Sequence, residues 1–233
     1  MLPNHHIFQW FIPSPTFHLA PIPASLRYQW AAAILACMSL ILAAVLIAKL
    51  PLVVRTYDSV GLSARAIERA QESAGITLAA IGIQPIWRPC HAAVCITRPK
   101  PHEVEVRLVH STPLSERGSL GFAAVDVVQH AGVLATIYVD RVEALAAQAG
   151  VDESALLGRA VAHEIGHLIL GSTDHARSGL MRATWKSDEV RRDMPLDWIF
   201  SERQGAEIRL RLAETVSPPV LESIAASDRR PAQ

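Results

Sequence analysis

Hydrophobic residues follow three different patterns along this 233-residue chain. From Trp30 to Ala48 there is no charged side chain, and such a stretch is long enough to cross a lipid bilayer as a helix. Between residues 52 and 139, apart from one helical segment, short β-branched or alternating runs are separated by turns, which is typical of strands. Residues 161–170 are apolar around nearly the whole helical circumference, which predicts a buried helix.

These patterns predict an ordered series of elements. Ser63 can cap a helix that runs to about Ala80, and Asp152 can cap the buried helix. In residues 103–108, apolar and charged side chains alternate, which predicts a strand with one face toward water. The predicted strands are 52–57, 83–87, 104–108, 121–128 and 134–139, and further helices are predicted at 140–149 and 201–212.

The buried helix contains three polar side chains that an apolar environment would not favour. His163 and His167 are four residues apart, so their rings point to the same side of the helix. Burying unpaired polar groups is costly, and one zinc ion bound by both imidazoles would remove most of that cost. Glu164 would then lie beside the metal, where it could take a proton from a bound water. This His-Glu-x-x-His spacing predicts a zinc hydrolase; hydrogen-bonded core histidines are the alternative.

The residues after the helix offer a third ligand. Gly171 can end the helix with a positive φ angle, after which the chain can return His175 to the metal. Asp174 and Glu189 are the alternative third ligands, and Glu189 would require a helix at about 187–192 packed over the first. We predict His175, because it is an imidazole close in sequence to the other two.

Residues 178–181, Ser-Gly-Leu-Met, form a predicted tight turn that contains Met181. The helix motif, the helix-ending glycine, the third histidine and this methionine together resemble the metzincin clan of zinc metallopeptidases. The resemblance implies that Met181 lies beneath the metal in a Met-turn. This chain has three residues, where the usual pattern has two, on each side of Gly171. The longer spacing, with a Trp shortly after the Met, resembles a group of small exported bacterial proteins of unassigned role.

The resemblance also implies a fold. Metzincins place five strands and two main helices before the metal-binding loop, which matches the order predicted here. We therefore expect an α+β domain at about residues 52–214, with a mixed, twisted five-stranded sheet and two main helices above a zinc cleft. A small, mostly irregular or helical lower subdomain would follow Gly171.

In the metzincin order, the predicted strand 121–128 borders the cleft at an edge of the sheet. An extended peptide could pair with this open edge through main-chain hydrogen bonds, beside Gly121, Phe122, Ala123 and Ala124. The alternative is an internal strand that is paired on both sides.

The cysteines and the apolar segment indicate the cellular compartment of the protein. Cys90 and Cys95 lie in a predicted loop, where a disulfide is expected and a zinc site with His91 is the alternative. We expect residues 30–50 to be a transmembrane anchor, with the apolar region of a signal peptide as the alternative. By the positive-inside rule, the basic residues that flank this segment would place the part of the chain after it inside the cell. A disulfide and an N-terminal export segment favour the outside, so we expect a periplasmic or extracellular, membrane-anchored domain.

The overall composition limits the partners. With 22 basic and 22 acidic residues and no dense basic cluster, nothing indicates nucleic-acid binding. Residues 1–29 are Pro-rich and predict a disordered leader, and residues 215–233 predict a flexible tail.

Taken together, the sequence predicts a zinc metallopeptidase that binds one Zn²⁺ and a peptide or protein substrate, with Glu164 as general base. The metal-activated water would be the nucleophile. A zinc-dependent amidase of cell-wall peptides is one alternative. A membrane-anchored, non-catalytic zinc-binding module is the other, although a structural zinc site has no need of Glu164.

Overall fold

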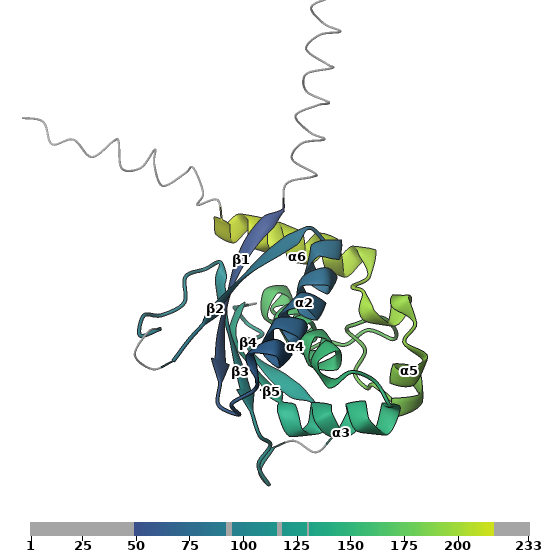
Figure 1. Cartoon of the computed structure of the whole chain (residues 1–233). Helices are drawn as coiled ribbons and strands as arrows, with labels where there is room; N and C mark the ends of the chain where they lie inside the picture. The colour runs from purple at the N-terminus through teal and green to yellow at the C-terminus, as the bar shows by residue number, and fades with distance from the viewer. Residues whose placement is uncertain (1–48, 92–94, 116–117, 130, 217–233) are drawn as a thin grey trace, which may run out of the picture. The chain divides into compact units, whose positions relative to one another are not determined.

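The computed structural model describes residues 49–91, 95–115, 118–129 and 131–216 (Figure 1). The predicted leader (1–29), the apolar run of the predicted anchor (30–48) and the tail from residue 217 lie outside these residues. Among the helices in the described part of the chain, none is both long and apolar enough to cross a membrane. The membrane anchor therefore stays a prediction.

A five-stranded mixed sheet forms one layer of the described domain (Figure 1). In spatial order its strands are β2 (Ile83–Pro89), β1 (Leu50–Asp58), β3 (Glu103–Val109), β5 (Ala131–Tyr138) and β4 (Gly121–Asp126). The first four strands are parallel, whereas β4 runs antiparallel to β5 at the edge of the sheet. Leu52, Val106 and Ile137 are among the fully buried strand residues, because helices cover this face of the sheet.

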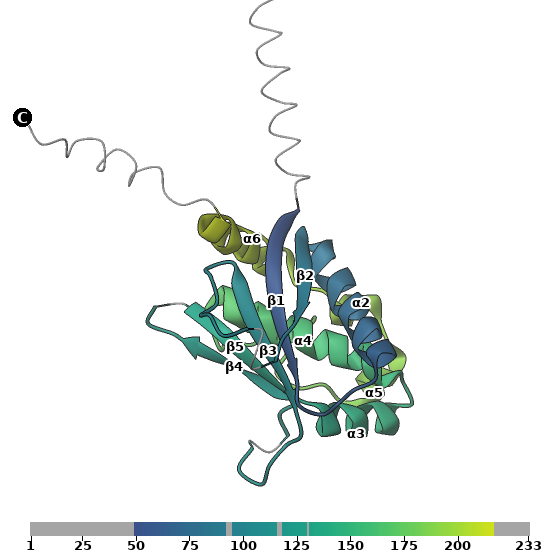
Figure 2. The same cartoon turned by 60° about the vertical axis from the view of Figure 1, so that its left-hand side comes forward.

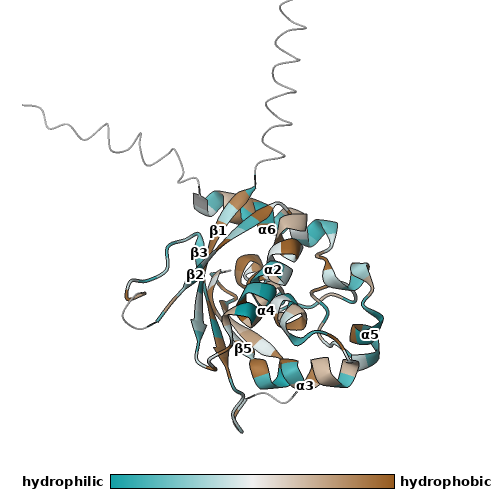
Figure 3. Cartoon of the chain, in the orientation of Figure 1, coloured by the Kyte–Doolittle hydropathy of each residue, from teal (hydrophilic) through white to brown (hydrophobic). Residues whose placement is uncertain are grey.

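Two long helices, α2 (Ala64–Ala80) and α4 (Glu153–Leu170), lie side by side on that face (Figure 2). Helix α3 (Val139–Ala149) follows β5 directly, and hydrophobic and hydrophilic bands alternate along it (Figure 3) because one of its sides is buried. After α4 the chain forms a lower subdomain of three short or peripheral elements: α5 (Ser187–Arg192), η1 (Pro195–Trp198) and α6 (Glu202–Val216).

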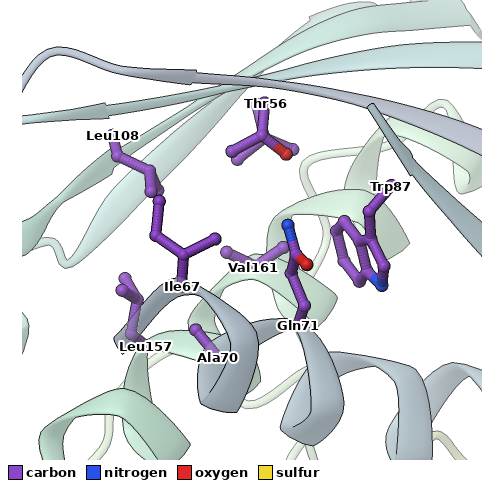
Figure 4. Close-up of a pocket in the computed structure, with 9 residues that line it drawn as sticks. Thr56, Ile67, Ala70, Gln71, Trp87, Leu108, Leu157 and Val161 are labelled. Atoms are coloured by element: carbon purple, nitrogen blue, oxygen red, sulfur yellow. The ribbon is translucent and has the colours of Figure 1, made fainter. Parts of the chain in front are cut away.

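The two long helices approach closely at Gly158 of α4. A Cβ atom there would lie 2.2 Å from the main-chain oxygen of Ala70 in α2, so only glycine permits this crossing. Beside it, the helices and the sheet leave a cavity of about 20 Å³ whose lining includes Thr56, Gln71 and Trp87 (Figure 4). The hydroxyl oxygen of Thr56 is buried and has no hydrogen-bond partner among the described residues. The cavity is large enough for one water molecule.

The predicted elements are present, with boundaries shifted by a few residues. Strand β4 ends at Asp126 because its Oδ1 accepts hydrogen bonds from the main-chain N–H groups of Val128 and Gln129, which turns the chain. Strand β5 then begins at Ala131, earlier than expected. The helix at residues 187–192 that a Glu189 ligand would require is also present, as α5.

One expectation about β3 is wrong, since its charged face is not open to water along its whole length. Glu103 is 4% exposed and forms an ion pair with Arg55 of β1, which is 3% exposed. The loop after β2 covers this pair, and Nη1 of Arg55 donates a hydrogen bond to the oxygen of Thr97 at 2.6 Å. The alternating pattern indicates a strand correctly, but it does not reveal a loop that covers the strand's second face.

The loop after β2 is closed by a disulfide between Cys90 and Cys95, whose Cα atoms are 5.5 Å apart. The predicted bridge is therefore present, and its sulfur atoms are not available for a zinc site with His91. The hydroxyl of Tyr57 donates to the oxygen of Cys95 at 3.4 Å, which links the loop to β1. The bridge thus restrains the loop that covers Arg55 and Glu103.

Candidate metal centre

Helix α4 positions the candidate site, and specific residues define both of its ends. Asp152 caps the N-terminus, where its Oδ1 accepts a hydrogen bond from the N–H of Ala155 at 2.8 Å. Gly171 ends the helix with a φ angle of 59°, a left-handed conformation that glycine adopts at little cost. Nearly every residue between these ends is buried, so the polar side chains of the helix are held inside the protein.

Three histidines meet at the C-terminal end of α4. Nε2 of His167 lies 3.1 Å from Nε2 of His163 and 3.3 Å from Nε2 of His175. The candidate ligand atoms of all three lie within 4.8 Å of one another. Zinc–nitrogen bonds of about 2.0–2.1 Å in a tetrahedral set imply nitrogen separations of roughly 3.3 Å. The two separations from His167 match this value, and the three imidazoles are close enough together to bind one zinc ion.

The protonation of the two helical histidines also suits a metal. Nδ1 of His163 lies 2.8 Å from the oxygen of Leu180, and Nδ1 of His167 lies 2.8 Å from the oxygen of Ser172. Because a carbonyl oxygen only accepts hydrogen bonds, each Nδ1 carries the proton and each Nε2 keeps a free lone pair. Burial lowers the pKa of His163 to about 3 and also lowers the pKa of His167, so both rings stay neutral.

His175 reaches this cluster in spite of its longer spacing from the helix. In the intervening turn, the N–H of Asp174 donates to the Oγ of Ser172 at 3.0 Å. Just beyond, the N–H of Ala176 donates to the oxygen of Met181 at 2.8 Å. These bonds hold the segment on both sides of His175, whose side chain is exposed at the outer side of the cluster.

The two alternative third ligands do not belong to the cluster. Asp174 is exposed and lies outside the group of three histidines. Glu189 faces Arg182 instead, with 3.7 Å between its Oε2 and the Nε of the arginine. The same Oε2 accepts a hydrogen bond from the N–H of Lys186 at 3.4 Å, so Glu189 caps its own helix.

Glu164 lines the same cleft as the three histidines. Its side chain is buried, and burial raises the pKa of its carboxyl group to about 8. The carboxyl group lies close to the edge strand, because a Cβ atom at Gly121 would be 3.3 Å from its Oε1. A carboxyl group with a pKa near the working pH can both take up and release a proton, as a general base and acid must.

Met181 packs against α4 at the level of the histidines. It is fully buried, and a Cβ atom at Gly166, between His163 and His167 in the sequence, would lie 2.7 Å from its Sδ. The turn of residues 178–181, which we call the Met-turn, thus contacts the metal-binding part of the helix. The role of Met181 beneath a metal stays an implication of the resemblance.

A cleft of about 1180 Å³ contains the histidines and Glu164 in its lining. Its other walls come from the loop before β4, from β4 itself, from α3 and from the residues after the Met-turn. Gly121, Phe122 and Ala123 line the cleft, whereas Ala124 does not. Within the described sheet β4 pairs only with β5, which leaves its other edge without a neighbouring strand.

Trp185 and Arg182 are among the cleft residues that were not identified as site residues from the sequence. Trp185 lies edge-on to the ring of His163, with the ring centroids 5.7 Å apart and an interplanar angle of 87°. Arg182 follows Met181 directly and lines the cleft, although it is only 8% exposed. The only sequence signal for this segment was a Trp shortly after the Met.

No family model matches the sequence, and no curated protein is significantly similar to it. A zinc-dependent peptidase from Methanocorpusculum labreanum (strain Z) has a solved structure that is similar to part of this chain. The sequences are 16% identical, the match covers 66% of this chain and 99% of that chain, and the TM-score is 0.45. Fold and site define an α+β domain with a three-histidine candidate metal centre.

Proposed function

We propose that this protein is a zinc-dependent metallopeptidase. The observation that carries the proposal is the convergence of three imidazoles beside a buried carboxyl group in a large cleft. Three imidazoles leave a position open for water or substrate, which is typical of catalytic zinc sites. When bound, the zinc ion would lower the pKa of a bound water toward about 7 and polarise a substrate carbonyl group.

The residues of the chain have separate roles in the proposed reaction. Glu164 takes a proton from the water as general base and returns it to the leaving amine as general acid. The hydrogen bonds from His163 and His167 to main-chain oxygens hold their rings with Nε2 directed into the three-histidine cluster, where these atoms would bind the metal. His175 completes the ligand set from the exposed side, next to the opening of the cleft.

We also propose that a peptide substrate binds alongside β4. The unpaired edge of Gly121–Asp126 offers main-chain N–H and C=O groups to an extended chain. Because Gly121 is next to Glu164, such a chain would pass beside the reacting groups. Gly121, Phe122 and Ala123 line the cleft and would lie beside the substrate, whereas Ala124 would contribute only main-chain contacts.

We propose an exported location for the domain. Disulfides persist in oxidising compartments, and the bridge between Cys90 and Cys95 is favoured there. A membrane anchor through residues 30–48 would keep the domain at the cell surface or in the periplasm.

The test of the function is Glu164→Gln in the full chain, with zinc content and peptide cleavage measured together. The variant should keep about one zinc per chain and lose hydrolysis, because Glu164 is a base and not a ligand. Glu153→Gln, an exposed position on the same helix, is the matched control and should keep both. Full hydrolysis by Glu164→Gln would contradict the proposal. Zinc without any hydrolysis in the natural protein would favour a non-catalytic zinc module, and cleavage of cell-wall peptides alone would favour an amidase.

A further inference from the structure

The segment after the Met-turn contains a buried arginine that the proposed chemistry does not use. Arg182 is 8% exposed, and burial lowers the pKa of its guanidinium group. Its Nε and Nη2 atoms have no hydrogen-bond partner among the residues that the structure describes. Burial of a charge is costly unless nearby groups compensate for it, so the surroundings of Arg182 must favour the cation.

Two indole rings provide part of this compensation. Cζ of Arg182 lies 4.8 Å from the ring centroid of Trp198 and 5.6 Å from that of Trp185, within the range of cation–π attraction. Trp198 also lies beneath Cζ of Arg159, at 4.1 Å, and the two indoles meet edge to face at 5.1 Å. We refer to Arg159, Trp198, Arg182 and Trp185 as the Arg–Trp stack.

The Arg–Trp stack begins on α4 with Arg159 and ends against α4 with Trp185, next to the three-histidine cluster. Arg159 precedes His163 by one helical turn, and Trp185 at the other end lies edge-on to the His163 ring. Asp193 holds Arg159 and Trp198 in place. Its Oδ1 accepts a hydrogen bond from Nε1 of Trp198 at 2.9 Å and pairs with Nη1 of Arg159 at 2.7 Å. The residues after the Met-turn are therefore attached to the helix at two points.

Arg182 also binds the Met-turn itself. Its Nη1 donates to the oxygen of Gly179 at 2.9 Å and to the oxygen of Asp197 at 2.6 Å. Its main-chain N–H donates to Gly179 as well, at 3.3 Å. The turn closed in this way contains Leu180, whose oxygen accepts a hydrogen bond from Nδ1 of His163. The position of the turn thus sets the orientation of the His163 ring.

We propose that Arg182 is a positioning residue, which holds His163 with Nε2 directed at the metal through the Met-turn and the Arg–Trp stack. The inference rests on the proposed metal site, but not on the proposed hydrolysis. Lysine at this position would keep the charge but lose the planar group that reaches both main-chain oxygens. Methionine would keep much of the packing and lose the charge.

The test compares Arg182→Met and Arg182→Lys with the natural full chain. Zinc affinity is measured by competition with a chromophoric chelator, and coordination geometry by the visible absorption spectrum of bound Co²⁺. Arg182→Met should lower zinc affinity by about 10–100-fold and change the Co²⁺ spectrum, with a smaller loss for Arg182→Lys. Arg177→Gln, at an exposed arginine just before the Met-turn, is the matched control and should change neither.

Trp198→Phe replaces an indole in the middle of the Arg–Trp stack and leaves the residues of the Met-turn unchanged, so it gives a second, independent measurement. It should weaken zinc binding in the same direction, and its effect should be less than additive with Arg182→Met. If Arg182→Met does not fold, Arg182→Lys and Trp198→Phe decide the question. Natural zinc affinity and an unchanged Co²⁺ spectrum in the folded variants would overturn the inference. A natural protein that binds zinc but cleaves no peptide would contradict the proposed function alone, and one that binds no metal would contradict both.

Discussion

At the scale of single residues, burial acts on the site in two opposite directions. It lowers the pKa of His163 and raises the pKa of Glu164, because in each case it disfavours the charged form. In the metal-free protein both groups are therefore neutral near pH 7. Neutral imidazoles can lie with their Nε2 atoms near one another without charge repulsion. A bound divalent cation would then favour the ionised form of Glu164, which is the form that acts as a base.

The third ligand can be tested by single alanine variants at His175, Asp174 and Glu189. His175→Ala should weaken zinc binding by orders of magnitude, because it removes one of three ligands. Asp174→Ala and Glu189→Ala should cost at most about 10–100-fold, since neither side chain belongs to the histidine cluster. Competition with a chelator measures all three affinities. If His175→Ala bound zinc as tightly as the natural protein, the ligand would be elsewhere and the metzincin resemblance would lose its support.

Glu164→Gln should stabilise the metal-free protein at alkaline pH. Burial raises the pKa of Glu164 from 4.5 to about 8 in the folded state, so the unfolded chain releases its proton first. The free energy of unfolding therefore falls as the pH rises from about 4.5 to about 8. Glutamine cannot ionise, so the variant should be more stable by several kcal/mol near pH 8 and little changed near pH 4. Urea unfolding with a metal chelator measures the difference, and a less stable variant at pH 8 would contradict the raised pKa.

At the scale of elements, the site depends on how closely the edge strand approaches α4. Gly121 begins β4, and a Cβ atom there would lie 2.5 Å from the main-chain oxygen of Thr136 in β5. The same atom would be 3.3 Å from Oε1 of Glu164. Glycine at this position therefore permits both the pairing of β4 with β5 and the close contact with the proposed base.

Gly121→Ala should displace the start of β4. The alanine methyl group would push against a main-chain oxygen that cannot move freely, so we expect a loss of about 1–3 kcal/mol in unfolding free energy. Peptide cleavage should fall by more than zinc affinity, because the strand borders the cleft but supplies no ligand.

Gly75→Ala in α2 is the matched control for that substitution. Its Cβ would meet only Pro85, at 3.9 Å, so the variant should gain about 0.5–1 kcal/mol from helix propensity. Thermal or urea unfolding of both variants measures the contrast. Equal stability of Gly121→Ala and the natural protein would show that β4 is not held where the structure places it.

The order of elements could be predicted from the sequence because it depends on local signals. Ser63, Asp152 and Gly171 act on their nearest neighbours in the chain, and the structure has each at the predicted helix end. The environment of Glu103 could not be predicted in the same way, since its buried partner Arg55 comes from a strand 48 residues earlier in the chain.

The residues of the candidate site could likewise be predicted only where they lie close together in the sequence. The histidines of α4 have a fixed spacing on one helix, so a pattern identifies them. The Arg–Trp stack joins Arg159 of α4 to residues beyond the Met-turn, and no spacing rule links an arginine to indoles so distant in sequence. Only the folded arrangement of the lower subdomain brings these side chains together.

At the scale of the described domain, the disulfide and the candidate metal centre lie at opposite edges of the sheet. The bridge closes the loop after β2, which is one edge strand, whereas the cleft borders β4, the other edge strand. Strands β1, β3 and β5 lie between them. A change at the bridge should therefore alter stability without altering the site.

Replacing both Cys90 and Cys95 by serine tests this separation. The bridge closes a short loop, so its loss should lower the free energy of unfolding by about 2 kcal/mol. The loop would also cover Arg55 and Glu103 less tightly, which would lower the free energy of unfolding further. Zinc affinity should stay that of the natural protein, since no ligand depends on the loop; a large loss of zinc binding would show that the two edges of the sheet are coupled.

In the natural protein, isolated from its own compartment and kept under non-reducing conditions, Cys90 and Cys95 should be joined. Mass spectrometry should find the peptide that contains Cys90 and Cys95 two hydrogens lighter than its reduced form, because the thiols are joined. The reason is the compartment and not only the geometry: a disulfide between such close cysteines persists where the surroundings are oxidising and is reduced in most cytosols. Free thiols at both positions would contradict the exported location, while the proposed zinc chemistry at the other edge of the sheet would be unaffected.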